Sequence, residues 1–321
     1  MRLLEAGFKV EVIAECIDGD VARIPSGGAG GLWFPYLCEQ TERMGVWAND
    51  SRTAFEELMR DEPEASGVAV KSCWQCYSPG EAPPPWAPDC PSFRLLSRPE
   101  LEAKYGPDGP GFDVGDDFLA YAFDAPIIRM GDFLAYLRAR IAHMGGVLKE
   151  AHVSDVSDPS LEAAVVVNCA GLGNATELEG LERDAAMKPV RGQIIHIKNR
   201  PHLDTSITVA CGRESAYFIP RGDFTILGGT ADEGAWDTSV NDDVIADILA
   251  RCGRLMPAEV MRDIEIIGHW VGLRPFRSEG IRLDSTRMDD GRMLVRNYGH
   301  GGAGITLCWG CADEVVRLAT A

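Results

Sequence analysis

The glycine-rich segment near the C-terminus constrains the fold more than any other part of the chain. Residues 293–295 are an apolar run that predicts a strand, and residues 307–318 carry apolar side chains at helical spacing. Between them, glycine occupies positions 299, 301, 302 and 304. Such a loop lets the backbone approach a ligand closely, and the amides and dipole of the following helix favour an electron-rich group. The segment therefore predicts an α/β protein with a ligand site at this loop.

The same loop contains the pattern G-x-G-x-x-G, formed by Gly299, Gly301 and Gly304. A dinucleotide-binding fingerprint of this kind needs a second strand after the helix, with an acidic residue about 20 positions on. The sequence runs only to Ala321. We therefore expect the loop to bind something other than a dinucleotide pyrophosphate, and a glycine turn used only for packing is the alternative.

Composition excludes several classes of function. The chain has 321 residues, enough for about two domains. A net charge of −18 argues against a nucleic-acid partner, and the sequence holds no apolar run of about 18 residues that could span a membrane. The first residues lack a signal-peptide core, the last three are not a peroxisomal signal, and ten cysteines without a secretion signal suggest reduced thiols. We expect a cytoplasmic protein.

The N-terminal segment resembles half of a dinucleotide-binding unit. Gly7 is placed to end a short helix, residues 8–14 alternate like a strand, and Glu15 follows at the strand's tip. In a βαβ unit that acid binds the adenosine ribose. The unit's first strand and glycine turn should lie about 20 residues earlier, before the start of this sequence. An ordinary surface glutamate after a strand is the alternative.

Further α/β elements follow, and an antiparallel region separates them. Residues 25–36 form a second glycine-rich stretch, and the apolar run 163–169 reads as a buried parallel strand followed by a glycine turn at Ala170. We also expect helices over 41–60, 131–143 and 240–255, and strands over 68–77, 147–153, 193–197, 207–211, 217–220, 224–227 and 264–273.

Cys73 and Cys76 form a C-x-x-C pattern on the expected strand 68–77. Residues three apart on a strand face opposite sides of the sheet, so the two thiols should point apart. We expect buried structural thiols at these positions, and no metal site.

Six stretches, taken together, resemble the D-amino-acid oxidase family of FAD-dependent flavoproteins. They follow the family's order and cover nearly the whole chain. The stretches are Gly30-Gly31-Leu32-Trp33-Phe34-Pro35-Tyr36, Val166-Val167-Asn168-Cys169-Ala170-Gly171, Arg191-Gly192-Gln193, Leu227-Gly228-Gly229-Thr230, Gly272-Leu273-Arg274-Pro275-Phe276-Arg277 and Asn297-Tyr298-Gly299-His300-Gly301-Gly302-Ala303-Gly304-Ile305-Thr306.

The resemblance implies an α/β (α+β) fold with two domains. A discontinuous Rossmann-like FAD-binding domain would comprise residues 1–57, 127–182 and 281–321, and would lack its first strand in this sequence. A substrate-binding domain with a mixed, largely antiparallel sheet would comprise 58–126 and 183–280. Because the first strand and pyrophosphate loop are not in the sequence, we expect weak or no FAD binding if the sequence is complete, and a start codon placed downstream of the true one is the explanation we favour.

The resemblance also implies roles for particular residues. Arg274 and Tyr217 would bind the substrate α-carboxylate, a role that suits a planar guanidinium, and the Gly302 carbonyl would accept a hydrogen bond from the amine. Implied contacts to FAD come from Glu15, Ser26, Gly30, Gly31, Leu32, Val153, Ala170, Gly301, Gly304, Ile305 and Thr306.

The implied reaction is hydride transfer from the substrate Cα to FAD, followed by reoxidation with oxygen. The products would be a 2-oxo acid, ammonia and hydrogen peroxide. Three departures stand out: Arg213 replaces a tyrosine of the active site, Phe34 stands where some relatives have a polar residue, and Ala303 replaces a common aromatic residue. A cation at position 213 would favour acidic D-amino acids, or would face solvent on a mobile lid.

Two other functions are compatible with these motifs. The first is a glycine or sarcosine oxidase, or a dehydrogenase that passes electrons to an acceptor other than oxygen. The second is a non-catalytic remnant that no longer binds FAD. A D-amino acid and oxygen are the expected partners, and a homodimer is compatible with the sequence.

Overall fold

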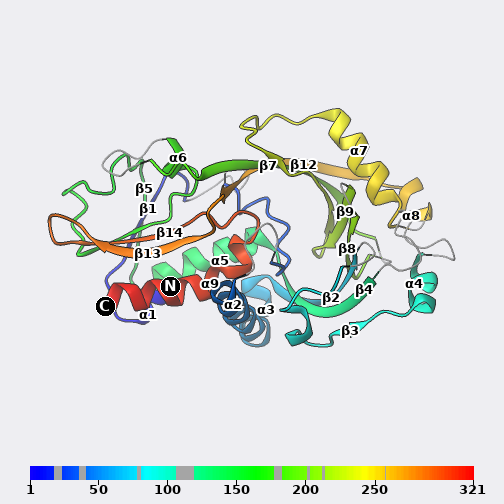
Figure 1. The fold of residues 1–321 in the computed structure, drawn as a ribbon, viewed down its shortest axis with the longest axis horizontal. Helices are drawn as coiled ribbons and strands as arrows, with labels where there is room; N and C mark the ends of the chain where they lie inside the picture. The colour runs from blue at the N-terminus through cyan, green and yellow to red at the C-terminus, as the bar shows by residue number, and fades with distance from the viewer. Residues whose placement is uncertain are drawn as a thin grey trace.

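The computed structural model describes residues 1–17, 24–35, 41–77, 81–105, 119–176, 183–200, 203–211, 214–256 and 258–321. Its elements divide into a large curved sheet and a second region that holds two smaller sheets and the long helices (Figure 1). The mixed α/β fold expected from the sequence is confirmed.

The large sheet has nine strands in the order β11-β7-β10-β9-β8-β2-β4-β3, and β12 also pairs with β7. β2 and β8 are parallel, and the other pairs are antiparallel. The expected mixed, largely antiparallel sheet is therefore present. The strands are β2 (Val68–Tyr77), β3 (Arg94–Leu95), β4 (Leu119–Ile128), β7 (Met187–Lys198), β8 (Ser206–Cys211), β9 (Glu214–Pro220), β10 (Phe224–Gly228), β11 (Asp232–Glu233) and β12 (Ile266–Arg277).

The two faces of this sheet have different neighbours. α7 (Asp242–Gly253) packs its buried Ile248 and Cys252 against one face, together with α8 (Ala258–Arg262) and residues of α4 (Arg98–Tyr105). The opposite face carries a smaller apolar cluster that includes Ile194 and Ile226, with Tyr217 and Trp270 packed on it. That second face is turned toward the rest of the molecule (Figure 1), and it carries the site described below.

The remaining strands form two smaller sheets, each with one parallel pair. β1 (Glu11–Ala14) pairs with β5 (Val147–Glu150), and β6 (Val165–Asn168) pairs with β14 (Met293–Tyr298), which pairs antiparallel with β13 (Arg282–Arg287). Within the described residues, β1 and β6 belong to separate sheets.

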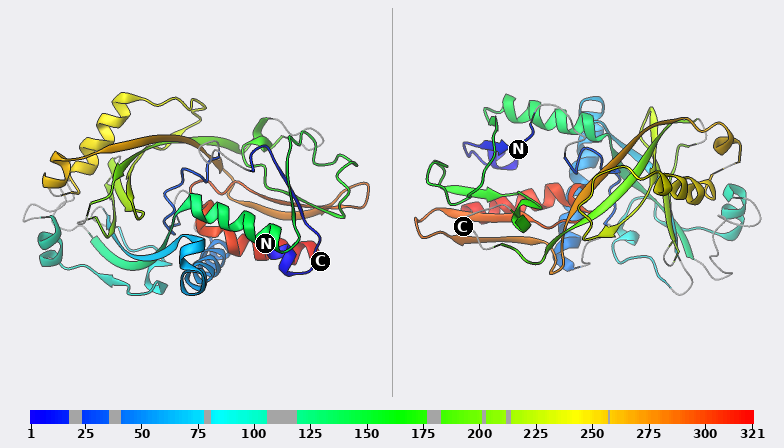
Figure 2. Two further views of the ribbon diagram at one scale, coloured as in Figure 1. Left: turned by 180° about the vertical axis from the view of Figure 1, so that it is seen from behind. Right: turned by 90° about the horizontal axis from the view of Figure 1, so that it is seen from above.

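Long helices pack against these strands. α2 (Glu42–Asp61) crosses α9 (Gly304–Thr320) so closely that a Cβ added at Gly310 would lie 2.4 Å from the Cα of Trp47. α1 (Arg2–Glu5) joins α9 through an ion pair of 2.9 Å between Arg2 and Asp313, near both chain termini (Figure 2). The other helices are α3 (Pro63–Ser66), α5 (Met130–His143), α6 (Gly173–Thr176) and the 3₁₀ turn η2 (Ala87–Asp89).

Most expected elements exist, with shifted ends. The strand expected over 8–14 begins only at Glu11, and β12 continues four residues past the expected end at 273. The ends of β1 and β12 differ from the expectation because pairing with β5 and β7 determines them, and local periodicity does not indicate that pairing. The strands of the parallel sheets lie within 1–57, 127–182 and 281–321. The nine-stranded sheet comes from 58–126 and 183–280, apart from the end of β4. The domain boundaries remain a prediction.

Cys73 and Cys76 point apart, as expected, because each belongs to a different hydrophobic cluster. A second C-x-x-C, Cys308 and Cys311, lies in α9, where burial raises the pKa of Cys308 to about 12. Among the cysteines whose side chains the structure describes, no disulfide is formed. No described helix combines the length and apolarity needed to cross a membrane.

Candidate functional site

Glycines on the inner face of the large sheet make a flat floor for three side chains. A Cβ added at Gly192 would lie 2.4 Å from Nη1 of Arg274, and one at Gly228 would lie 2.1 Å from Cζ of Tyr217. A Cβ at Gly272 would lie 1.7 Å from the Trp270 ring. The absence of side chains on this floor is what lets the guanidinium, the phenol and the indole lie flat on the sheet.

The strand register places these three side chains side by side. Gly272 pairs with Gly192 across β12 and β7, and Gly228 pairs with Tyr217 across β10 and β9. Nη1 of Arg274 donates to the Thr230 carbonyl at 3.0 Å. Since Thr230 follows directly on the glycines beneath Tyr217, the Arg274 guanidinium and the Tyr217 ring are neighbours. The structure thus brings the two expected carboxylate-binding residues together.

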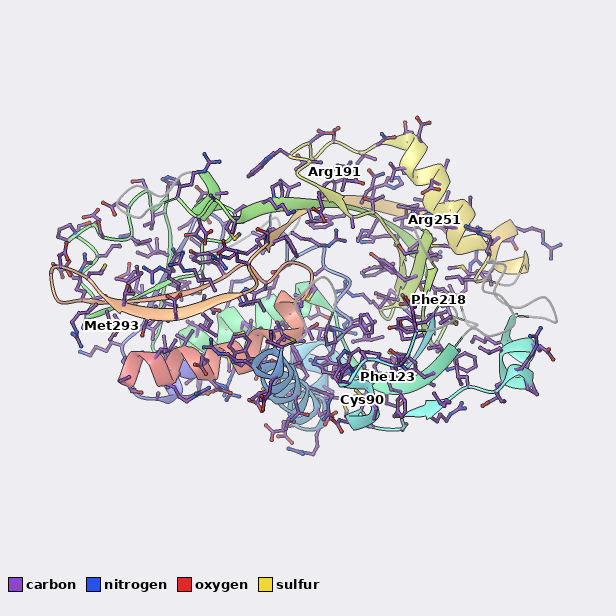
Figure 3. The ribbon with its side chains drawn as sticks, viewed as in Figure 1. Cys90, Phe123, Arg191, Phe218, Arg251 and Met293 are labelled. Atoms are coloured by element: carbon purple, nitrogen blue, oxygen red, sulfur yellow. The ribbon has the colours of Figure 1, made fainter. Side chains whose placement is uncertain are left out.

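Helix α7 supports this floor from the other face of the sheet. Nη2 of Arg251 donates to the Gly229 carbonyl at 3.3 Å, and its Nη1 donates to the Ser215 carbonyl. Arg191 reaches the segment before α7, where Nη2 donates to the Ser239 carbonyl at 2.7 Å. Figure 3 labels both arginines in this region. These buried charge-assisted bonds hold the backbones that carry Tyr217 and the glycines.

The C-terminal glycine loop is joined directly to the strand that carries Arg274. Gly301 N donates to the Pro275 carbonyl at 2.9 Å, and Phe276 forms a β-bridge with His300. Gly299 and Gly301 both have positive φ, 85° and 55°, which explains glycine at these positions. Burial lowers the pKa of His300 to about 4, so its imidazole is neutral at pH 7. Gly302, next in the loop, is exposed.

The loop leads into α9, whose N-terminus is free of a side-chain cap in the described structure. The first-turn amides, including those of Gly304, Ile305 and Thr306, therefore remain available to an external acceptor. The Thr306 hydroxyl is already engaged within the chain, since it accepts from Phe34 N at 3.1 Å and donates to the Phe34 carbonyl at 2.9 Å. We therefore expect a ligand contact at position 306 to come from the backbone amide.

Residues 29–34 run between this helix and the large sheet. Leu32 forms a bridge with Ile127 of β4, Ile128 N donates to the Gly31 carbonyl at 2.7 Å, and Trp33 Nε1 donates to α2 at 2.9 Å. Gly31 has a φ of 68°, and a Cβ there would lie 2.1 Å from the Ile128 carbonyl oxygen. The segment that includes Gly30, Gly31 and Leu32 is therefore fixed on several sides.

The residues expected to contact the adenosine of FAD lie at the carboxyl edge of the parallel strands. Ala151 N donates to the Ala14 carbonyl at 2.9 Å, which brings Glu15 beside residues 152 and 153. The Glu15 carboxylate contacts Nδ1 of His152, and Val153 follows immediately. After β6, the amide of Ala170 is held by the Asn168 side chain at 3.0 Å. The structure brings Glu15 and Val153 together at one edge.

Of the expected site residues, Arg213 lies outside the described residues. Ser26 lies in the described turn before Gly30 and is partly exposed. Sequence reasoning missed Trp270 and Arg221, whose positions become apparent only when distant strands pair. It included Thr230 in a family-like stretch but did not show that its carbonyl accepts from Arg274. Gly192 and Gly228 belonged to the family-like stretches, but their function as a floor under Arg274 and Tyr217 could not be seen from their spacing.

The described residues fit FAD at two of its ends. The uncapped amides of α9 suit the polar edge of a flavin. Glu15 offers a carboxylate to ribose hydroxyls. The chemistry of these groups agrees with the cofactor that the sequence motifs implied.

Comparisons with known proteins agree with this geometry. A family model described as FAD dependent oxidoreductase matches residues 1–318. A D-amino-acid oxidase of Streptomyces coelicolor is 37% identical over 301 residues, covering 93% of this chain and 86% of that protein. A D-amino-acid oxidase of Rubrobacter xylanophilus is 36% identical and covers 100% of this chain and 91% of its own length. The glycine oxidase structure from Geobacillus kaustophilus matches with a TM-score of 0.76 at 21% identity, covering 99% of this chain and 90% of that one, which shows a shared fold.

Proposed function

The chain belongs to the family of FAD-dependent oxidoreductases that includes the D-amino-acid oxidases, and on that premise we propose that it converts D-amino acids to 2-oxo acids, ammonia and hydrogen peroxide. The observation that carries the proposal is the pair formed by Arg274 and Tyr217 on the glycine floor, next to the loop that holds Gly302. A cation and a phenol side by side suit a carboxylate, and a carbonyl-bearing loop nearby suits an amine.

We propose that the orientation of the bound substrate accounts for most of the catalysis. The planar guanidinium of Arg274 can bind the α-carboxylate through two nitrogens, while Tyr217 adds one hydroxyl donor. The Gly302 carbonyl would accept a hydrogen bond from the neutral amine. When these three contacts hold the substrate, its Cα hydrogen can point in only one direction. Orientation of the substrate, rather than acid–base chemistry at Cα, then carries the catalysis.

When bound, FAD supplies the acceptor for the hydride from Cα. We propose that Gly301, Gly304, Ile305 and Thr306 hold its pyrimidine edge through their backbones, where the positive end of the α9 dipole favours negative charge. Ser26, Gly30, Gly31, Leu32 and Ala170 would contact the remaining flavin side, and Glu15 and Val153 the adenosine.

We also propose a preference for acidic D-amino acids. Its support is the arginine at position 213, where the resembled family carries a tyrosine of the active site. A second cation near the substrate side chain would bind its carboxylate. The preference is tested separately from the oxidase activity, because D-alanine lacks the second carboxylate.

The proposed function is tested by measuring peroxide from the purified chain supplied with excess FAD. D-alanine, D-aspartate, L-alanine, glycine and sarcosine are compared. Peroxide from D-alanine but not from L-alanine supports the proposal, and a higher kcat/KM for D-aspartate supports the acidic preference. Faster turnover of glycine or sarcosine would favour the amine oxidase alternative, turnover only with an artificial electron acceptor would favour a dehydrogenase, and no turnover of any substrate would favour the non-catalytic alternative.

A further inference from the structure

Two side chains of the large sheet hold the turn formed by residues 26–31, which we call the 26–31 turn. Trp270 lies on β12, four residues before Arg274, and Arg221 follows β9 directly after Pro220. Neither residue belongs to the motifs that indicate function. Both contact the turn at positions between its start at Ser26 and the anchor of Gly31 on β4.

Trp270 contacts the turn through its indole ring. A Cβ added at Gly28 would lie 1.9 Å from the ring, and one added at Gly272 would lie 1.7 Å from another part of the same ring. The indole is thus held between the backbone of the turn and the backbone of β12. Gly272 precedes Arg274 by two residues on the same face of β12, so this contact joins the turn to the strand that carries Arg274. Arg274 and Tyr217 together are called the carboxylate clamp.

Arg221 contacts the turn through a hydrogen bond from a buried cation. Arg221 is 5% exposed, and its Nη1 donates to the Ala29 carbonyl at 2.8 Å. The guanidinium lies 5.4 Å from the Phe224 ring centroid, and a Cβ at Gly31 would lie 3.5 Å from its Cζ. Burying a cation is costly, so a position that keeps one at this turn needs a compensating gain.

The two contacts fall on neighbouring residues of the turn, Gly28 and Ala29. Burial lowers the pKa of Arg221 to about 10, which still leaves it protonated at pH 7. The Nε atom of Arg221 is buried and has no partner in the described structure, so the side chain's known bond is directed at the turn alone. A Cβ added at Gly30 would lie 3.0 Å from Cδ1 of Ile219 on β9.

We propose that Trp270 and Arg221 are positioning residues that fix the 26–31 turn on the substrate sheet, so that the FAD-contacting turn and the Arg274–Tyr217 clamp keep one relative geometry. This inference rests on the proposed assignment of the turn to FAD. It adds a cause for the alignment of the two sites: the sheet that carries the clamp also holds the turn.

The test uses the full chain with four substitutions and two matched controls. Arg221→Met and Trp270→Ala remove the contacts, while Arg221→Lys and Trp270→Phe keep a donor or a ring. Arg129→Met replaces a nearby arginine whose side chain is 42% exposed, and Trp236→Ala replaces a tryptophan that is 49% exposed. Thermal unfolding is recorded for each variant to identify any that fails to fold.

Hydrogen–deuterium exchange without added FAD measures the turn directly. We expect the amides of Gly27 and Ala29 to exchange about tenfold faster in Arg221→Met, the ratio expected for losing one hydrogen bond from a charged donor. They should also exchange faster in Trp270→Ala, which loses the packing of the indole on the turn. Titration with FAD, followed by flavin absorbance, should show a dissociation constant raised by about the same factor. Arg221→Lys and Trp270→Phe should recover part of both effects, and the controls should match the wild type.

Two outcomes overturn the inference. Unchanged exchange in a folded Arg221→Met protein would show that the arginine does not hold the turn. Faster exchange with an unchanged FAD dissociation constant would show that the turn is held but that its position does not affect the cofactor. Neither outcome touches the oxidase assignment, which depends on peroxide formation and on Arg274. If the chain makes no peroxide yet the turn loosens and FAD binding weakens, the positioning role stands.

Discussion

Replacing Gly192 by alanine should move the Arg274 guanidinium while leaving the fold intact. The new Cβ would lie 2.4 Å from Nη1, 2.5 Å from Nη2 and 2.6 Å from Cζ of Arg274. Non-bonded atoms of this kind prefer separations of about 3.5 Å or more, so the guanidinium must move by about 1 Å. The atoms met are the far end of a flexible side chain, which can move without displacing the backbone.

The magnitude follows from the geometry that the clamp requires. A misplacement of about 1 Å costs about a hundredfold in rate, or about 2.7 kcal/mol of transition-state stabilisation. The effect on folding should be small. An added methyl group in a packed region costs about 1–3 kcal/mol, and a glycine-to-alanine change within a strand returns about 0.5–1 kcal/mol. We expect kcat/KM for D-alanine to fall about a hundredfold, with a loss of stability of at most about 2.5 kcal/mol.

Steady-state peroxide formation with D-alanine, together with urea unfolding, measures both quantities. Gly45→Ala is the matched control, because a Cβ at Gly45 in α2 meets no heavy atom within 4 Å. That control should gain about 0.5–1 kcal/mol in stability and keep wild-type kcat/KM. Wild-type kcat/KM in Gly192→Ala would refute the reasoning, because it would mean that the position of the guanidinium does not matter to the reaction.

Three further variants test other parts of the structure. Tyr217→Phe removes one donor to a carboxylate and should raise KM for D-alanine about tenfold or more, as steady-state kinetics would show. Gly310→Ala should destabilise the chain by about 1–3 kcal/mol in urea unfolding, because its Cβ would lie 2.4 Å from backbone atoms of Trp47. Burial by itself raises the pKa of the Asp184 carboxyl, but hydrogen bonds from Arg277, the amide of Ala186 and Tyr298 outweigh it and hold that pKa below its usual range. Its stabilising effect is therefore present above about pH 4 and is lost as pH falls through the lowered folded pKa, so Asp184→Asn should lower the melting temperature at pH 7 and match the wild type more closely at low pH.

Much of the fold could be predicted from the sequence because its signals are local. The alternation of residues 68–77 predicts β2, and the spacing of apolar residues over 41–60 predicts α2 to within one residue at each end. The ends of β1 and β12 could not be predicted, because the strand ends where its partner does. β12 pairs with β7 as far as Arg277 and Met187, and no local sequence pattern indicates this long-range pairing.

The residues of the site also fall into two groups, those that the sequence indicates and those that only the structure shows. Arg274 and the loop around Gly302 stand within stretches specific enough to indicate a family. Trp270 and Arg221 carry no such signal, because a tryptophan and an arginine on antiparallel strands are ordinary residues until the 26–31 turn is placed against them. The glycine floor was visible as separate glycines, and only the register of β7, β10 and β12 places those glycines beneath the same group of side chains.

The central claim is that this chain oxidises a D-amino acid whose carboxylate is bound by Arg274, and flavin absorbance tests it most directly. The purified chain, supplied with excess FAD and kept free of oxygen, is mixed with D-alanine or with L-alanine. We predict loss of the oxidised-flavin absorbance with D-alanine alone, its return with peroxide when oxygen is admitted, and at least a hundredfold slower loss in Arg274→Ala, as expected for losing about 3 kcal/mol of charge pairing. Equal bleaching by L-alanine, or an Arg274→Ala protein as fast as the wild type, would contradict the account.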